Sequence, residues 1–312
     1  MHGQEDLSRY AWLSIATGVV VFTLKLGAFA LTGSVGLLSD ALESTVNIVA
    51  AVVALIALRA AARPGDQRHH FGLSKAEYFS ALVEGLMILV AAGLIMFTAI
   101  ERLLNPRPLE SLGVGLAISV VASVINGVVA GILMRAGRRH RSIVLVADAK
   151  HLMTDVWTSV GVIVGVVAVG LTDILRLDPL IAMAVALNIV YAGLQLIGSS
   201  AMGLLDAALP DEENAVIVEI LQRHQAEKIR FHAVQTRESG RQRFVSMHVL
   251  VPGEWSVARG HDLLEAVEGE IRAALPNTVV QTHMEPIEDP RAWEDQPPGG
   301  VTVPDEDLWS DS

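Results

Sequence analysis

Six long apolar stretches constrain the fold of this chain more than any other feature. Crossing the roughly 30 Å hydrocarbon core of a bilayer takes about 20 apolar residues in a helix, so each stretch predicts a transmembrane helix. The composition agrees, because 52% of the 312 residues are hydrophobic and only 18% are charged. We therefore predict an all-α membrane bundle in residues 1–208. Its spans are 11–32, 34–58, 77–100, 111–134, 143–171 and 178–204.

The short loops between these spans differ in charge. One set of loops carries nine basic residues: Arg9, Arg59, Arg63, Arg68, Lys75, Arg135, Arg138, Arg139 and Arg141. The other set carries three: Arg102, Arg107 and Arg176. Since basic residues collect on the cytoplasmic side, both termini are predicted to be cytoplasmic. The expected location is a bacterial inner (plasma) membrane.

The composition changes after Pro210. Residues 211–224 and about 256–275 read as helices, and 230–236, 241–251 and 277–284 read as strands, with a turn at 238–240. This α-β-β-α-β order predicts a small cytoplasmic α+β domain at 209–288, with its helices on one face of a sheet. Proline, glycine and acidic residues dominate the tail at 289–312, for which we predict disorder.

Two polar motifs interrupt the apolar spans. Glu43 and Asn47 lie four residues apart in the second span, and His151 and Asp155 lie four residues apart in the fifth. This spacing places each pair on one face of a helix. Polar side chains are costly inside a membrane, so they indicate a functional site. Hydrogen bonding between helices is the simpler reading for each residue alone, but matched frames in two spans favour a shared site.

Two such faces would supply four donors for one divalent cation. Three oxygen donors and one imidazole suit Zn²⁺, but also Fe²⁺, Co²⁺ or Mn²⁺. Because His151 and the carboxylates must be deprotonated to bind metal, H⁺ is the natural counter-ion. Asp40 and Asp148 each precede a motif by three residues. Each is a candidate for a group that hydrogen-bonds to a metal ligand, for a proton relay or for a paired structural charge. Glu84 lies near a cytoplasmic helix end, where simple solvation is one reading.

The sequence also argues against several classes of protein. The net charge is −11 and no basic stripe is present, which argues against nucleic acid as a partner. The chain has no cysteine, so thiolate metal sites and disulfides are excluded. A phosphate-binding G-x-x-x-x-G-K-[ST] loop and an H-E-x-x-H motif are absent, so we expect neither an ATP-driven pump nor an enzyme.

The polar motifs of the second and fifth spans, the six spans themselves and the soluble domain together resemble a known family. It is the cation diffusion facilitator family of metal–proton antiporters, and the resemblance covers about residues 8–288. The resemblance implies a homodimer in a lipid bilayer, with a transport site at Glu43, Asn47, His151 and Asp155. Zinc members usually carry His or Asp at the first position and Asp at the second, and this chain departs at both. His151 and Asp155 form the usual zinc pair.

The resemblance implies three further features. A loop metal site would use Asp66 and His69, with Leu73 at the position of the second histidine and His70 as its possible substitute. Lys75 and Asp206 match an ion pair that links the membrane and soluble domains. A binuclear zinc site at the dimer interface would use His232, His248, His261, His283 and Glu285, with Glu285 replacing the usual Asp.

The most favoured function is efflux of a divalent metal, Zn²⁺ first, in exchange for protons, with regulatory metal binding in the cytoplasm. Two alternatives stay open. One is efflux of Fe²⁺, Co²⁺ or Mn²⁺ by the same mechanism. The other is a metal-sensing membrane protein whose transport site is impaired by Asn47.

Overall fold

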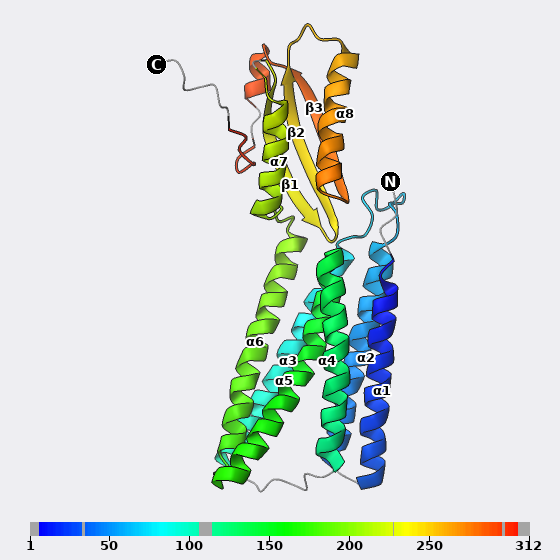
Figure 1. Cartoon of the computed structure of the whole chain (residues 1–312), viewed down its shortest axis with the longest axis vertical. Coiled ribbons are helices and arrows are strands. Elements are labelled where there is room, and N and C mark those ends of the chain that lie inside the picture. Colours follow the sequence, from blue (N-terminus) through cyan, green and yellow to red (C-terminus); the bar gives the residue numbers. More distant parts are fainter. Residues whose placement is uncertain (1–5, 33–34, 106–113, 227, 295–296, 305–312) are drawn as a thin grey trace. The chain divides into compact units, whose positions relative to one another are not determined.

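The computed structural model describes residues 6–32, 35–105, 114–226, 228–294 and 297–304 (Figure 1). The chain divides into two compact units, Met1–Leu204 and Leu205–Ser312. Each unit has its own apolar core, as expected where the composition of a chain changes abruptly.

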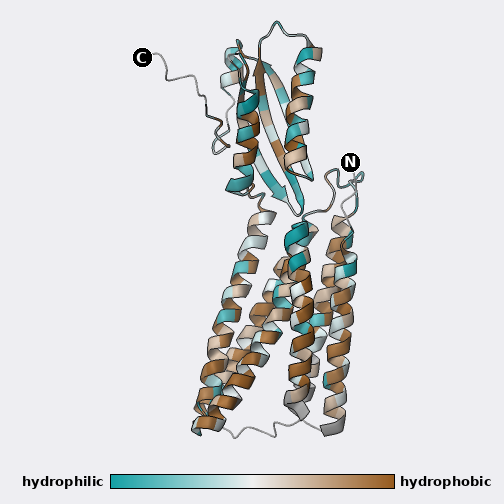
Figure 2. Ribbon diagram, viewed as in Figure 1, coloured by the Kyte–Doolittle hydropathy of each residue, from teal (hydrophilic) through white to brown (hydrophobic). Residues whose placement is uncertain are grey.

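The first unit consists of six long helices. All six are long and apolar enough to cross a membrane, which confirms the predicted bundle. Figure 2 shows apolar residues along most of each helix, on sides that face away from the bundle as well as towards it. A helix that is apolar all round is typical of a membrane span. The helices are α1 (Ser8–Thr32), α2 (Val35–Ala61), α3 (Ala76–Leu104), α4 (Val114–His140), α5 (Ile143–Thr172) and α6 (Leu177–Leu204).

The six helices form a four-helix group and a pair. Helices α1, α2, α4 and α5 share one core of leucine, valine and alanine. Helix α3 packs mainly against α6, and this pair meets α5 in a second, smaller core. Small residues allow the close approach of α3 and α6, because a Cβ atom at Gly85 would lie 2.8 Å from Cγ1 of Ile197. Helix α5 thus lies between the two groups and contacts both.

The second unit has the predicted α-β-β-α-β order. Strands β1 and β2 are antiparallel, while β3 pairs with β2 in parallel after the crossover through α8. A two-residue turn at 240–241 joins β1 to β2, with Gly240 at a positive φ of 57°. The turn comes later than predicted because β1 extends to Ser239. The elements are α7 (Asp211–His224), β1 (Arg230–Ser239), β2 (Gln242–Val251), α8 (Val257–Ala274) and β3 (Thr278–Pro286).

Both helices of this unit cover one face of the sheet. Ile217 from α7 and Val267 from α8 share a core with Val245 and Met247 of β2. Because side chains alternate along a strand, His248 projects from the other face. Ser256 caps α8 as predicted, with its hydroxyl accepting a hydrogen bond from the Arg259 amide over 3.3 Å.

The described part of the C-terminal segment contacts the second unit, and the disorder expected from its composition stays a prediction. A 3₁₀ helix spans Pro290–Trp293, and the Val301 amide donates a 2.7 Å hydrogen bond to the Val234 carbonyl. Val301 and Val303 pack against the core of the unit. A few apolar residues among prolines and acids are therefore enough to hold the segment against β1.

Candidate metal sites

The α2 and α5 motifs meet inside the membrane unit. Asn47 of α2 lies between His151 and Asp155 of α5. Its Nδ2 donates to Asp155 Oδ2 over 2.5 Å, and its Oδ1 is 2.7 Å from His151 Nε2. Asn47 and His151 are buried, with exposures of 7% and 5%. The spacing of four residues in each helix therefore brings three of the four predicted ligands together.

The chemistry of these three groups fixes their hydrogen-bond directions. A carboxylate only accepts hydrogen bonds, so the amide nitrogen of Asn47 faces Asp155 and its oxygen faces His151. That oxygen also only accepts, so the proton on the His151 ring lies on Nε2. His151 Nδ1 has no hydrogen-bond partner among the described residues. In this arrangement the amide bridges two candidate ligands and engages Nε2 of His151, which leaves Nδ1 as the ring nitrogen without a proton.

Asp155 receives a second hydrogen bond that was not predicted from the sequence. Nδ2 of Asn126, a buried residue of α4, donates to Asp155 Oδ2 over 3.1 Å. The signal for it was present, because an asparagine inside an apolar span is itself an expensive residue. Asn126 therefore ties α4 to the same carboxylate that α2 contacts.

A cavity of about 620 Å³ reaches this group of residues. Its walls come from α2, α3 and α5, and Asn47, His151 and Asp155 supply polar groups among mostly apolar neighbours. A pocket with few, convergent polar groups is the usual form of a binding site. Glu43 and Asp40 lie on α2, but their side chains are outside the described part of the structure.

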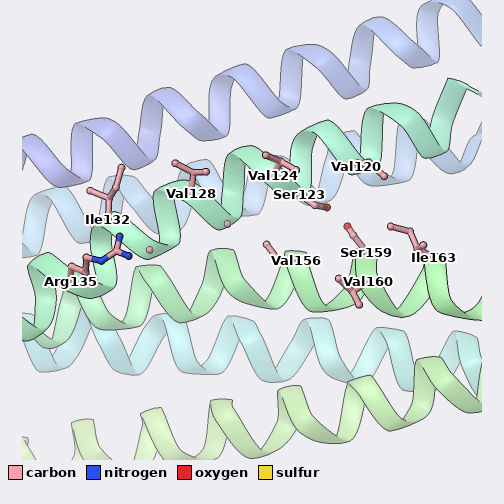
Figure 3. A pocket seen from close by; sticks show the side chains of 12 residues that line it. Val120, Ser123, Val124, Val128, Ile132, Arg135, Val156, Ser159, Val160 and Ile163 are labelled. Carbon is pink, nitrogen blue, oxygen red and sulfur yellow. The ribbon is translucent and has the colours of Figure 1, made fainter.

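A second hollow lies between α4 and α5 and contains none of the predicted ligands. It measures about 630 Å³ and is lined mainly by valines, with Ser123 and Ser159 along its length and Arg135 at one end (Figure 3). Such a surface offers no metal donors beyond two hydroxyl groups. We therefore place the candidate transport site at the α2–α3–α5 cavity.

Two acidic residues outside the motif are also buried. Asp148 has an exposure of 1% and accepts a 2.9 Å hydrogen bond from Ser14 of α1. Glu84 of α3 has an exposure of 0%. The reading of Glu84 as a solvated residue is wrong, because α3 turns it towards the helix bundle rather than towards the membrane surface.

The soluble unit places three predicted histidines in one row across the sheet. His232 of β1 is the register partner of His248 of β2, which is in turn the partner of His283 of β3. Glu285, two residues beyond His283, projects from the same face. Ring centroids in the row are 5.1 Å apart for each neighbouring pair.

Glu285 is the common contact of this row. Its carboxylate lies 3.4 Å from His232 Nε2, 3.3 Å from His248 Nδ1 and 3.4 Å from His283 Nε2. One donor atom each from His232, His248 and Glu285 fall within 4.8 Å of one another. Neither ring nitrogen of His232 has a hydrogen-bond partner in the described part of the chain. Two imidazoles and a carboxylate at this spacing fit a zinc ion.

The ring of Trp293 stacks on His232, with centroids 6.0 Å apart and an interplanar angle of 30°. The indole nitrogen donates to the Ile287 carbonyl over 3.1 Å, which fixes the ring beside the histidine row. His261 is not part of this group within one chain. It is exposed on α8.

The predicted loop site is only partly assembled. Asp66 Oδ1 lies 3.5 Å from His69 Nδ1, and the same oxygen accepts hydrogen bonds from the amides of Arg68 and His69 at 2.8 and 2.7 Å. These amides lower the pKa of Asp66. His70 is exposed, and among the described residues it does not join a group of three metal donors. The carboxylate of Asp66 therefore organises the turn.

Lys75 and Asp206 lie in different units, and their pairing remains a prediction. Within the first unit, Lys75 Nζ donates to the carbonyl oxygen of Leu204 over 3.3 Å. Within the second, Asp206 forms a 2.8 Å ion pair with Arg237.

Six membrane helices with polar donors buried between them, followed by an α+β unit with a histidine row, define a membrane transporter of metal cations. Comparison with known proteins agrees. Residues 11–205 match the cation efflux transmembrane domain, and residues 209–287 match the cytoplasmic domain of cation efflux proteins. The chain belongs to the cation diffusion facilitator family, which confirms the resemblance inferred from its motifs.

Individual relatives cover nearly the whole chain. An uncharacterized transporter of Synechocystis sp., sll1263, is 51% identical over 91% of this chain and 92% of its own length. The cation-efflux pump FieF of Pectobacterium atrosepticum is 30% identical over 87% of this chain and 90% of its own. FieF of Klebsiella pneumoniae is 31% identical over 90% and 93%.

Proposed function

We propose that this cation efflux transporter carries Zn²⁺ out of the cytoplasm of a bacterium in exchange for protons. The observation that carries the proposal is the contact of His151 and Asp155 with Asn47 beside a 620 Å³ cavity. An imidazole and a carboxylate from one helix, with oxygen donors from Asn47 and Glu43 on another, form a ligand set that zinc accepts.

Proton exchange follows from the chemistry of the ligands. His151 binds a metal only through a nitrogen that carries no proton, and the acids bind only when ionised. A proton arriving at this site therefore competes with the metal and favours its release. Rocking of the helix groups about α5 would expose the site to alternate sides of the membrane. The basic loops support cytoplasmic termini and an inner-membrane location.

The soluble unit is proposed to sense the metal. The row of His232, His248, His283 and Glu285 would bind Zn²⁺, and His261 of a second copy would complete the site in a homodimer. A metal that binds the paired arrangement more tightly stabilises it and shifts the population of states. Cytoplasmic metal would in this way bias the transport cycle.

Two alternatives rest on particular residues. Efflux of Fe²⁺, Co²⁺ or Mn²⁺ is favoured by the oxygen-rich donor set at Glu43, Asn47 and Asp155. A metal sensor without transport is favoured by the amide of Asn47, which engages His151 and Asp155 through hydrogen bonds.

Uptake of Zn²⁺, Mn²⁺, Fe²⁺ and Co²⁺ into proteoliposomes under an imposed pH gradient distinguishes these readings. Zinc uptake that depends on the gradient supports the antiporter. Preference for another ion supports the same mechanism with a different substrate. Absence of all uptake, with metal still bound by the soluble unit, would refute transport and support the sensor.

A further inference from the structure

The hollow between α4 and α5 continues into a second hollow that lies further along the same two helices. The second hollow measures about 430 Å³, and Gly131 and Arg135 of α4 line both of them. In the second hollow, the lining extends to Arg138 on α4 and to Ala149 on α5. The two hollows therefore form one groove along these helices, from Val120 at one end to Arg138 at the other, which we call the α4–α5 groove.

The α4–α5 groove is apolar in one part and positively charged in the other. Valine and isoleucine side chains line the apolar part over roughly 18 Å, which is the length of α4 from Val120 to Ile132. One leaflet of the hydrocarbon core is about 15 Å thick, so this part is long enough for a lipid acyl chain. The other part contains three cationic side chains, Arg135, Arg138 and Lys150.

These three cations have no acidic partner in the groove. None of the described residues that line it is an Asp or a Glu. The side chains of Arg135 and Arg138 form no hydrogen bond, ion pair or ring contact within the described part of the chain. Lys150 Nζ donates to the neutral amide oxygen of Gln195 over 3.2 Å. The charged part of the groove is therefore open to an anion from outside the chain.

Arg135 is directed along the groove rather than towards the end of its helix. A Cβ atom at Gly131 would lie 3.7 Å from Nη1 of Arg135, so the guanidinium reaches back one turn along α4 towards the apolar part. Figure 3 shows this side chain at the end of the row of valines. A basic side chain near the end of a membrane helix ordinarily extends to the interface, where water solvates its charge. A guanidinium that points the other way suits an anion that is itself anchored in the bilayer.

We propose that the α4–α5 groove binds one anionic phospholipid, with its phosphate at Arg135 and Arg138 and an acyl chain along the valines. Basic pockets between membrane helices on the cytoplasmic side are typical sites for anionic headgroups. A guanidinium binds phosphate through two parallel N–H donors, which orients the headgroup as well as neutralising it. On the proposed orientation the lipid comes from the cytoplasmic leaflet. It contacts α5, the helix that carries His151 and Asp155.

Charge favours a lipid over a second copy of this chain as the occupant. Most paired copies are related by twofold symmetry, which places the same patch of both molecules face to face. The three cations of one groove would then meet the same three cations of the other. An anionic lipid offers the opposite charge and an apolar chain in one molecule.

Native mass spectrometry of the full-length protein in detergent tests this site. Phosphatidylglycerol and phosphatidylcholine with identical acyl chains are added in separate titrations, so that only the headgroup differs. We expect wild type to retain one phosphatidylglycerol per chain and to bind phosphatidylcholine roughly tenfold more weakly. Arg135→Gln should lose this preference. Arg139→Gln should keep it and is the matched control, because Arg139 is exposed at the same end of α4 but does not line the groove.

A second pair of variants tests the apolar part of the groove. Val124 and Val121 are both exposed on α4, but only Val124 lines the groove. A tryptophan ring at position 124 would occupy the space of the acyl chain. Val124→Trp should therefore weaken the retention of phosphatidylglycerol, and Val121→Trp should leave it unchanged.

Several outcomes would overturn the inference. Equal retention of the two lipids by wild type is one, and this comparison does not depend on the folding of any variant. Equal losses in Arg135→Gln and Arg139→Gln would indicate only a general attraction to the basic surface. A Val124→Trp protein that retains the lipid but no longer dimerises would assign the groove to a second copy. Because lipid counts do not require transport, failure of zinc antiport leaves this site standing, and loss of this site leaves the antiporter standing.

Discussion

Replacement of Asn47 by aspartate tests the transport site at the residue where it departs from the usual zinc pattern. The amide of Asn47 donates to Asp155 over 2.5 Å, so it competes with a metal for a carboxylate oxygen. A hydrogen bond to a charged group contributes about 1.5–3 kcal/mol. An ionised aspartate cannot donate this bond, so metal binding no longer has to break it. Since 1.4 kcal/mol corresponds to a tenfold change, we expect Zn²⁺ to bind roughly 10- to 100-fold more tightly.

The assay is Zn²⁺ uptake into proteoliposomes under an imposed pH gradient, with KM compared between wild type and Asn47→Asp. Asn47→Leu is the matched control, because it also removes the hydrogen bond to Asp155 but supplies no ligand oxygen. A decrease in KM shared by both variants would come from release of Asp155, and a decrease confined to the aspartate would come from the new ligand. An unchanged or increased KM in Asn47→Asp would refute the reasoning. A wild type that prefers another ion and turns to zinc in the variant would refute the zinc assignment.

Three more predictions concern other parts of the chain. His151→Ala should abolish uptake whereas His261→Ala should only weaken its response to cytoplasmic metal, and equal losses would contradict separate transport and sensing roles. Arg243→Ala should destabilise the soluble unit by about 3–5 kcal/mol, because it leaves the half-buried Glu213 without the two 2.8 Å hydrogen bonds from Arg243. Thermal unfolding measures this loss of stability, and an unchanged unfolding transition would contradict the prediction. The pKa of Asp66 is lowered, so its turn should persist above the ordinary pKa near 3.8 and be lost as pH falls through the lower value. Amide exchange at Arg68 reports this, and Asp66→Ala should show fast exchange at every pH.

The membrane helices could be predicted because hydropathy alone decides them. The predicted spans and the observed helices differ by at most six residues at an end, and the largest difference falls where α4 continues through Arg135 to His140. The polar residues at this end belong to the helix although they lie beyond the apolar stretch from which the span was predicted. The strands of the soluble unit were also predicted from the sequence, but β1 is longer than predicted because the turn begins only at Gly240.

Contacts between distant residues could not be predicted in the same way. The pairing of His232 with His248 and His283 depends on strand register, which no local pattern specifies across a crossover. The burial of Glu84 depends on how α3 rotates against α5 and α6, and hydropathy does not report that rotation.

The bond between the C-terminal segment and β1 has a consequence for association between molecules. The register between β1 and β2 shifts between His232 and Gln235. On the outer edge of β1, the backbone of Val234 pairs with Val301 in an isolated bridge. An exposed, regular edge strand is a template for unwanted pairing with another chain, and a bulge or a covering segment removes that template. The C-terminal segment therefore covers part of the β1 edge, and we expect its removal from Pro290 onward to open that edge to strand addition.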